Sequence, residues 1–372
     1  MYEHKGLEDI FFIMLYGGAA LLALAACCYL LFTRGNLFLF DVKPHKTLRR
    51  WAAAFMASVV ASHVWWAVLG ISVLEDDRLL RNIVAITLDR LTFVPLMMVV
   101  LLRMLQDRKR SLWPVAVAMV PIAVIAVMSI VTRDDRFEYY TETYSALLAL
   151  SFIIYYVHAV KQYGRWLRDN YADLEHKEVW QSLVLISCIL FVYVCYTSNE
   201  GALFTEYLGQ MNTLVIIGFV LWRVETLQEL KEAPQEPASD AADDATANIP
   251  SLTEKDTSFI TELLATHCES AQLYLQHDLS LPQLAAAIGT NRTYLSNYFG
   301  ERNITYNFYI NHLRIEHFIR LYKKSADLPT QPTAKFLAVE SGFRSYATFG
   351  VAFKKHTGYT VTEWMKLLEI AT

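Results

Sequence analysis

Long apolar stretches dominate the chain before residue 223. Seven of them run for about 17–24 residues, the length that an α-helix needs to cross the hydrocarbon of a bilayer. They lie near Ile10–Phe32, Trp51–Leu74, Ile83–Leu102, Leu112–Val131, Tyr144–Val160, Trp180–Tyr196 and Leu208–Trp222. The pattern predicts an all-α fold that begins with a seven-helix transmembrane bundle over residues 1–224.

The apolar periodicity stops after the last of these stretches. Arg223–Leu230 can continue the seventh helix, but Ala233–Asn248 is rich in Ala, Pro and Asp and lacks any helical pattern. Such a composition is typical of a disordered segment. We therefore expect an acidic flexible linker over residues 225–256, whose charge repels DNA and anionic lipid; a merely solvated spacer is the simpler alternative.

Short amphipathic helices follow in the last third of the chain. Ser280 and Gln283 form the two ends of a predicted capping box, with Pro282 in the first turn, where a missing N–H costs little. The helix that they open ends at Gly289, and Asn291 is a good cap for a second helix over Arg292–Phe299. Two short helices joined by a turn that contains glycine are the helix-turn-helix plan.

A second copy of this pattern occurs closer to the carboxyl terminus. Leu337-Ala338 and Ser341-Gly342 repeat the spacing of Leu284-Ala285 and Ile288-Gly289, while Phe349 and Phe353 repeat Leu295 and Phe299. The stretch Thr305–Lys324 between the copies is predicted to be one long helix. Residues 257–372 therefore form a predicted domain with two related helix-turn-helix motifs.

This ordered series resembles the AraC/XylS family of bacterial transcription activators over about Thr257–Leu368. Besides the residues above, the resemblance rests on Tyr294-Leu295-Ser296, Tyr309-Ile310-Asn311, Leu313-Arg314-Ile315-Glu316, Phe343, Ser345-Tyr346, Phe353-Lys354-Lys355 and Gly358-Tyr359-Thr360. It implies an AraC-like domain that lays both motifs into successive major-groove segments of double-stranded promoter DNA. It also implies activation of transcription, with RNA polymerase as a partner.

The sequence departs from the family at several positions. Phe318 stands where the family usually has Ala, Gly300 replaces a usual Lys, and Val361 replaces a usual Pro. The stretch Lys323–Pro332 is also longer than usual.

The beginning of each second helix is the part that reaches base edges in this plan. In the first motif the candidates are Arg292, Thr293, Ser296 and Asn297, and in the second they are Arg344, Ser345 and Tyr346. Lys354, Lys355 and Thr357 are better placed for phosphates, which position the protein without specifying a sequence. For any single residue, the alternative is a solvated polar side chain.

The two motifs differ in the chemistry that they offer to bases. Ala347, Gly350 and Val351 occupy possible base-facing positions of the second motif and have no hydrogen-bonding side chains. We therefore expect the first motif to carry most of the sequence specificity. The domain is only weakly basic, which predicts weak isolated binding and favours a homodimer or adjacent binding sites.

Loop charges predict the orientation of the bundle. Lys and Arg gather in the first, third and fifth connections, which favours a cytoplasmic location for these loops and for the carboxyl terminus. The residues are Arg34, Lys43, Lys46, Arg49, Arg50, Arg103, Arg108, Lys109, Arg110, Lys161, Arg165, Arg168 and Lys177. The protein is thus expected in the inner membrane of a bacterium, with its amino terminus outside and its DNA-binding domain in the cytoplasm.

Two adjacent ionisable residues, Asp89 and Arg90, lie inside the third predicted span. Charged residues in a span are expensive and often functional. Neighbouring helix positions diverge by about 100°, so the two side chains face different directions. They can form a structural tie, with each other or with neighbouring helices, or they can serve intramembrane sensing.

Composition and motifs bear on which classes of function remain. Apolar residues make up 54% of the chain, above the soluble range of about 45–50%. The five cysteines show no C-x-x-C or Cys/His spacing, so no metal, cofactor or disulfide is expected. No phosphate loop or nucleophile motif is present, which argues against an enzyme.

The leading hypothesis is a membrane-embedded one-component transcription regulator. In this hypothesis the C-terminal domain binds promoter DNA sequence-specifically under the control of the membrane domain. The alternative is a membrane receptor or carrier whose C-terminal module is a protein-interaction domain.

Overall fold

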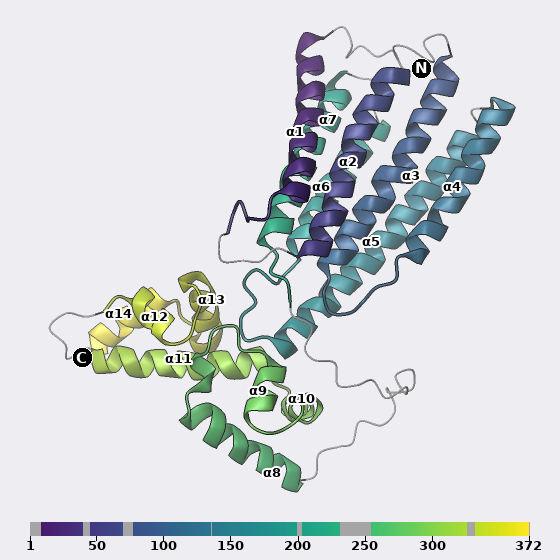
Figure 1. Ribbon diagram of the computed structural model, residues 1–372. Helices are drawn as coiled ribbons and strands as arrows, with labels where there is room; N and C mark the ends of the chain where they lie inside the picture. Colours follow the sequence, from purple (N-terminus) through teal and green to yellow (C-terminus); the bar gives the residue numbers. More distant parts are fainter. Residues whose placement is uncertain are drawn as a thin grey trace. The chain divides into compact units, whose positions relative to one another are not determined.

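The structure is a computed structural model that describes residues 9–39, 45–69, 77–134, 136–198, 203–230, 254–325 and 332–371. Within these ranges the regular elements are all helices, so the predicted all-α class is confirmed (Figure 1). The chain divides into two compact units. The first comprises Met1–Tyr163 and His176–Leu230, and the second comprises Gly164–Glu175 and Lys231–Thr372.

Among its described residues, the first unit is a bundle of seven helices, the number that the apolar pattern predicts. They are α1 (Ile10–Phe32), α2 (Lys46–Val68), α3 (Arg78–Met104), α4 (Trp113–Thr132), α5 (Arg136–Asn170), α6 (Gln181–Ser198) and α7 (Leu203–Thr226). Six of them are long and apolar enough to cross a membrane, by length and composition. The remaining helix, α6, is a shorter apolar helix over Gln181–Phe191 among the described residues.

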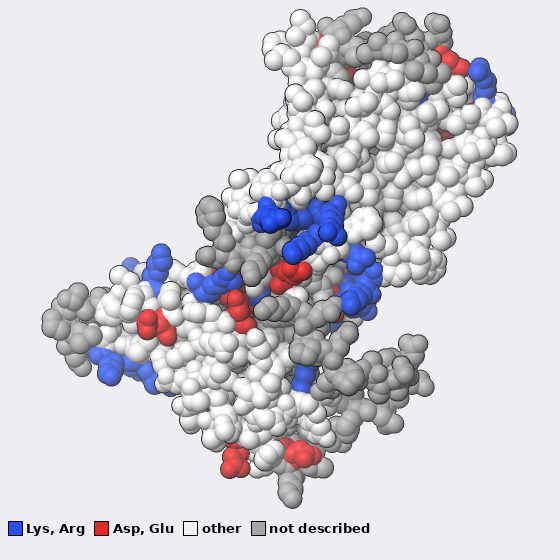
Figure 2. All heavy atoms as spheres, viewed as in Figure 1, with Lys and Arg blue, Asp and Glu red and all other residues white. Residues whose placement is uncertain are grey.

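The bundle turns large apolar side chains outward. On α4, Val117, Val120 and Val124 are more than half exposed, while Met119 and Ile122 are buried against the neighbouring helices. Exposing so much apolar surface to water is unfavourable, whereas hydrocarbon accepts it without cost. On the face seen in Figure 2, Lys and Arg side chains gather near the ends of the helices and leave the surface between them without charges. This distribution fits a bilayer.

Helix α5 is much longer than the apolar stretch Tyr144–Val160 that predicted it. It begins at Arg136 and ends at Asn170, so turns that mix charged and aromatic residues extend the apolar stretch at both ends. Glu138 lies in its first turn and Arg168 in its last, and both charges complement the helix dipole. The residues of α5 from Gly164 onward belong to the second unit.

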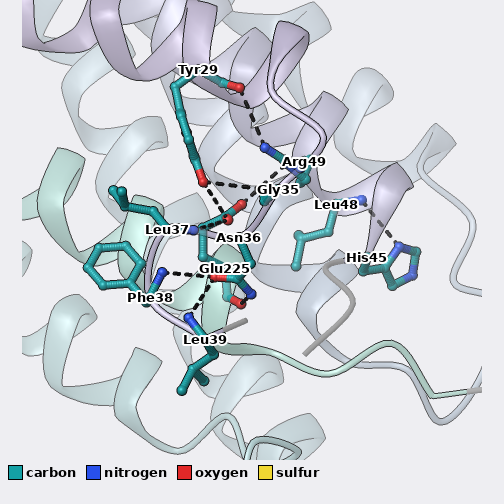
Figure 3. A network of polar contacts seen from close by, with 10 residues as sticks. All are labelled: Tyr29, Gly35, Asn36, Leu37, Phe38, Leu39, His45, Leu48, Arg49 and Glu225. Atoms are coloured by element: carbon teal, nitrogen blue, oxygen red, sulfur yellow. Dashed lines mark hydrogen bonds and ion pairs between the residues drawn. The ribbon is translucent and has the colours of Figure 1, made fainter. Parts of the chain in front are cut away.

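A polar network surrounds Glu225 in the last turn of α7 (Figure 3). The fully buried carboxylate pairs with Arg49 Nε at 3.2 Å and accepts a 2.9 Å hydrogen bond from the hydroxyl of Tyr29. Asn36 Nδ2 donates to the backbone carbonyl of Glu225 at 2.7 Å. Because a buried charge is costly to leave unpaired, this network fixes the end of α7 to α1, α2 and the chain between them.

Helix α7 ends at Thr226, one residue after Glu225, and the described chain continues for four more residues to Leu230. The predicted continuation Arg223–Leu230 is therefore helical only to Thr226. The predicted linker falls mainly on residues 231–253, which lie outside the described ranges.

The second unit consists of short helices around one long helix. In chain order they are α8 (Glu254–Leu263), the π-helical η3 (Leu264–Ser270), the 3₁₀ turn η4 (Leu273–Leu275), α9 (Leu281–Ala287), α10 (Arg292–Glu301), α11 (Tyr306–Ser325), α12 (Ala334–Glu340), α13 (Tyr346–Thr357) and α14 (Val361–Ala371). Helix α11 confirms the predicted long helix and contributes to both hydrophobic cores. Tyr306 and Ile310 pack in the core around α9 and α10, and Ile315 and Phe318 pack in the core around α12 and α13.

Phe318 has a structural explanation in the second core. Its fully buried ring lies 4.5 Å from that of Phe349 and 5.7 Å from that of Phe353, measured between centroids. Trp364 of α14 completes the cluster at 6.3 Å. The large residue at a position where the family usually has Ala thus fills an aromatic core.

Candidate nucleic-acid interface

The first helix-turn-helix motif comprises α9 and α10. Gln283 Oε1 accepts hydrogen bonds from the backbone N–H and the hydroxyl of Ser280, at 2.9 and 3.0 Å, so the predicted capping box is present. Gly289 adopts a φ of 79° in the turn, a left-handed conformation that favours glycine. Asn291 Oδ1 accepts from the backbone N–H of Tyr294 at 2.8 Å and caps α10 as expected.

Helix α10 separates an inward face from an outward face. Leu295 and Phe299 are buried in the core, as their spacing predicts. The four candidate base-reading side chains lie on the other side of the helix or at its exposed start. Arg292, Thr293 and Ser296 are exposed, and Asn297 is half-buried.

The second motif, formed by α12 and α13, repeats this plan with a tighter turn. Gly342 has a φ of 87°, and a Cβ atom there would lie 2.9 Å from the Cα and carbonyl oxygen of Leu275. Phe349 and Phe353 are buried, so the predicted duplication of core positions is confirmed. Tyr346, Lys354 and Lys355 are exposed.

Three other candidates in the second motif already have partners within the protein. Arg344 Nη1 pairs with Asp278 Oδ2 at 3.3 Å. Ser345 caps α13 by accepting from the backbone N–H of Thr348 at 3.2 Å. The hydroxyl of Thr357 donates to the carbonyl of Phe353 at 2.8 Å and helps to close the end of the helix. Their assignment to DNA stays a prediction, with Tyr346, Lys354 and Lys355 as the accessible members of the group.

A segment from elsewhere in the chain is built into this unit. Tyr171 forms an antiparallel bridge with Ser280, and the backbone N–H of Ala172 donates to the carbonyl of Leu279 at 3.3 Å. Asn307 Nδ2 donates to the carbonyl of Ala172 at 2.6 Å. The side chain of Ala172 is almost fully buried in the first core. We call Tyr171–Glu175 the docking segment.

The docking segment also reaches both helices that carry the base-reading candidates. Glu175 Oε2 accepts a 2.9 Å hydrogen bond from the hydroxyl of Thr348, in the first turn of α13. Burial raises the pKa of the Tyr171 hydroxyl, and the nearby positive charge of Arg292 opposes this rise. The segment therefore places a carboxylate at α13 and a phenol close to the start of α10.

Arg314 ties the long helix to the chain that precedes α9. Its guanidinium is almost fully buried and donates to the carbonyls of Tyr274 and Gln276, at 2.7 and 2.8 Å. Burial lowers its pKa, while the carboxylate of Asp173 in the docking segment is the strongest of the influences that raise it. Neither the docking segment nor Thr348 is foreseen from the sequence, because both acquire their roles through contacts between distant parts of the chain.

In the first unit, Asp89 and Arg90 turn to different neighbours, as their divergence on α3 predicts. Trp66 Nε1 of α2 donates to Asp89 Oδ2 at 2.8 Å. Arg90 Nη2 lies 3.8 Å from Glu142 Oε1 of α5. Of the alternatives open in the sequence, the geometry therefore gives ties to neighbouring helices; a sensing role stays a prediction.

Comparisons with known proteins identify a helix-turn-helix domain in the second unit. Residues 284–367 match the family model of a helix-turn-helix domain. An HTH-type transcriptional regulator of Staphylococcus aureus strain MRSA252 is 31% identical over 99 residues, and a similar regulator of strain COL gives the same values. The matched region covers 26% of this chain and only 12% of each relative's length. No solved structure matches the chain.

These findings bear on the C-terminal unit alone. They confirm the helix-turn-helix resemblance and support a DNA-binding regulator of transcription. The helices of the first unit have no counterpart in the matched region, which begins at residue 284 in the family model.

Proposed function

We propose that the protein is a membrane-embedded transcription regulator whose second unit binds promoter DNA sequence-specifically under the control of the membrane helices. The observation that carries the DNA-binding part is the pairing of two helix-turn-helix motifs on one long helix, α11. Both second helices bury their aromatic or aliphatic faces and leave polar or basic side chains exposed. Regulators of this type act by binding, so no catalytic role is proposed.

DNA binding is tested with the full chain in lipid nanodiscs and a pool of fragments from the source genome. We expect enrichment of a small set of promoter fragments, with an affinity that falls steeply as salt rises, because Lys and Arg contacts to phosphate release counterions. Equal recovery of all fragments, or none, would favour the receptor or carrier with a protein-interaction module instead.

The control by the membrane helices is supported by the docking segment. The segment follows α5 directly in the chain, and its Ala172 lies in the core of the DNA-binding unit. A shift of α5 therefore pulls on residues that touch α11 and α13. Because Glu175 places a negative charge at the start of α13, the docked state opposes the approach of DNA phosphate.

Glu175→Gln tests this control. The substitution keeps the size of the side chain and removes the charge, so we expect DNA affinity to rise several-fold at low salt. The dependence on salt should become slightly steeper, because the repulsion that salt screens is gone. Glu262→Gln is the matched control, since it removes an exposed carboxylate of α8 without touching the docking segment. If both variants bind DNA like the wild type, the docking segment does not restrain DNA binding by the second unit.

The location is proposed from the charge asymmetry of the loops: the inner membrane of a bacterium, with the amino terminus outside and the second unit in the cytoplasm. Activation of transcription, through RNA polymerase, follows from the family resemblance. A fluorescent reporter fused after Thr372 should be active in the cytoplasm, whereas an alkaline phosphatase fused there should stay inactive. The reverse pattern would contradict the orientation.

A further inference from the structure

Three side chains with metal-binding atoms converge between α11 and α13. His312 and Glu316 are four positions apart on α11 and therefore lie on the same face of the helix. His356 comes from the last turn of α13. The ligand atoms of all three residues lie within 4.8 Å of one another.

Two of the distances between the ligand atoms are close to those around a shared ion. His312 Nδ1 lies 3.1 Å from His356 Nε2, and His356 Nε2 lies 3.7 Å from Glu316 Oε1. A zinc ion about 2.0–2.1 Å from each ligand holds two ligand atoms roughly 3.3 Å apart in a tetrahedral site. Small rotations of the side chains are enough to bring the three atoms around one centre.

One hydrogen bond, between the two imidazole rings, links this cluster, while Glu316 Oε1 lies beyond hydrogen-bond distance. His356 Nε2 faces both His312 Nδ1 and Glu316 Oε1. A ring nitrogen offers either one N–H or one lone pair, so it can donate to only one of these two neighbours. A cation, in contrast, accepts the lone pairs of both imidazoles and of the carboxylate at the same time.

The surroundings favour a particular kind of ion. All three ligands are half-buried, and the ring of Phe308 stacks parallel to that of His312, at 6.4 Å between centroids and 4° between planes. Two imidazole nitrogens with one carboxylate suit zinc and similar transition ions, whereas magnesium and calcium prefer oxygen ligands alone. Three protein ligands leave a further position for water.

We propose that His312, Glu316 and His356 form a binding site for a divalent transition ion of the zinc class. The site joins the long helix α11 to the end of α13 and so holds the second motif against α11. It does not depend on the proposed function, because ion binding can be measured without DNA. The sequence predicts no metal site, since its search for ligands rests on local spacing, and His356 joins the other two only through the fold.

Calorimetric titration with Zn²⁺ tests the site. The full chain is purified in detergent with an affinity tag that contains no histidine, stripped with a chelator and titrated with zinc chloride. We expect saturable binding of one ion per chain. His312→Ala and His356→Ala should each weaken binding by at least roughly tenfold, because each removes a direct ligand.

His317→Ala is the matched control. His317 is also on α11, but its Nδ1 contacts the hydroxyl of Tyr274 and lies outside the cluster. This variant should bind zinc like the wild type. An equal loss in His317→Ala, or unchanged binding in both ligand variants, overturns the proposal.

Thermal unfolding separates loss of the site from loss of the fold. Zinc should raise the melting temperature of the wild type and of His317→Ala, but not that of the two ligand variants, because a ligand stabilises only the folded state that binds it. If an alanine variant fails to fold, Glu316→Gln decides, since its side chain is 44% exposed and tolerates the change. Wild-type zinc affinity in Glu316→Gln would then contradict the three-ligand site.

Discussion

The two helix-turn-helix motifs are built to the same plan and use their surfaces differently. In the first motif, Arg292, Thr293 and Ser296 are exposed at the start of α10. In the second, Arg344 pairs with Asp278, and Thr348 bonds to Glu175 of the docking segment. Duplication has thus produced one motif with an exposed polar face and another in which part of that face is engaged by the protein itself.

A duplicated fold can therefore divide two tasks between its copies. The shared core positions, such as Leu295 and Phe349, preserve the fold of each copy. The exposed positions are free to diverge because they contribute little to stability. We infer that the first motif supplies most of the sequence preference, while the second receives contacts from the rest of the protein.

Substitutions in the two recognition helices test this division of tasks directly. Arg292→Ala with Asn297→Ala should remove about 2 kcal/mol or more of discrimination between the preferred fragment and a scrambled one, roughly thirtyfold, since each bidentate base contact contributes about 1–3 kcal/mol. Arg344→Ala with Tyr346→Ala should change discrimination much less. Competition binding on the full chain measures both, with Lys324→Ala as the control for loss of one exposed positive charge.

Two outcomes of this experiment would contradict the assignment of base reading to the first motif. If the second pair lowers discrimination more than the first pair, the second motif is the principal reader. If neither pair matters while affinity falls, the residues contact phosphate and the base-reading assignment is wrong.

The two cores provide the next comparison. Phe318→Ala should lower the free energy of unfolding of the second unit by about 3–5 kcal/mol, because it leaves a cavity among Phe349, Phe353 and Trp364. Denaturant unfolding of the full chain, followed by tryptophan fluorescence, measures the change. Restoring the usual family residue without loss of stability would mean that the aromatic cluster repacks around the gap.

The turn glycines of the two motifs, Gly289 and Gly342, have similar backbone conformations but different surroundings. Gly342→Ala should cost about 2–5 kcal/mol, since it combines a left-handed φ with a clash against the backbone of Leu275. Gly289→Ala should cost only about 1–2 kcal/mol, because its left-handed φ is the only penalty and no atom lies within 4 Å of the added Cβ. Equal losses of melting temperature in the two variants would show that Leu275 moves away without cost.

The features that could be predicted from the sequence are those that local patterns encode. The caps at Ser280 and Asn291 were predictable because a cap and its partner lie within one helical turn. The inward faces of α10 and α13 followed from i, i+4 spacing. In contrast, Tyr171 meets Ser280, and His312 meets His356, only after the chain has folded. No periodicity within a single helix can reveal such pairs.

The length of α5 shows a second reason for failure. Its flanks, beginning at Arg136 and reaching Asn170, mix charged and aromatic residues and contain no continuous apolar run. The apolar stretch marks only the part suited to hydrocarbon, whereas helix propensity continues beyond it. The same extension leads the chain to the docking segment, whose contacts support the proposed membrane control. No apolar pattern in the sequence marks this segment.

The smallest expected effect distinguishes two capping boxes by pH. In α9 the box uses the amide of Gln283, which does not titrate, whereas before α14 Glu363 Oε2 accepts from the backbone N–H of Thr360 at 2.7 Å. This hydrogen bond, followed by that of the Thr360 side chain, lowers the pKa of Glu363 below its ordinary value. The folded state therefore binds this proton less readily than the unfolded state does. The Glu363 carboxylate contributes fully to the stability of the folded state above the ordinary pKa of Glu. This contribution is lost as the pH falls through the lowered pKa.

Hydrogen exchange between pH 6 and pH 3.5, corrected for intrinsic rates, measures this difference. The amides of α14 should lose relative protection as the pH falls, while those of α9 should keep theirs. Glu363→Gln, which installs the uncharged version of the box, should remove the pH dependence of α14. If the difference between α14 and α9 persists in this variant, another acid controls the last helix, and the two boxes differ by more than the charge of one side chain.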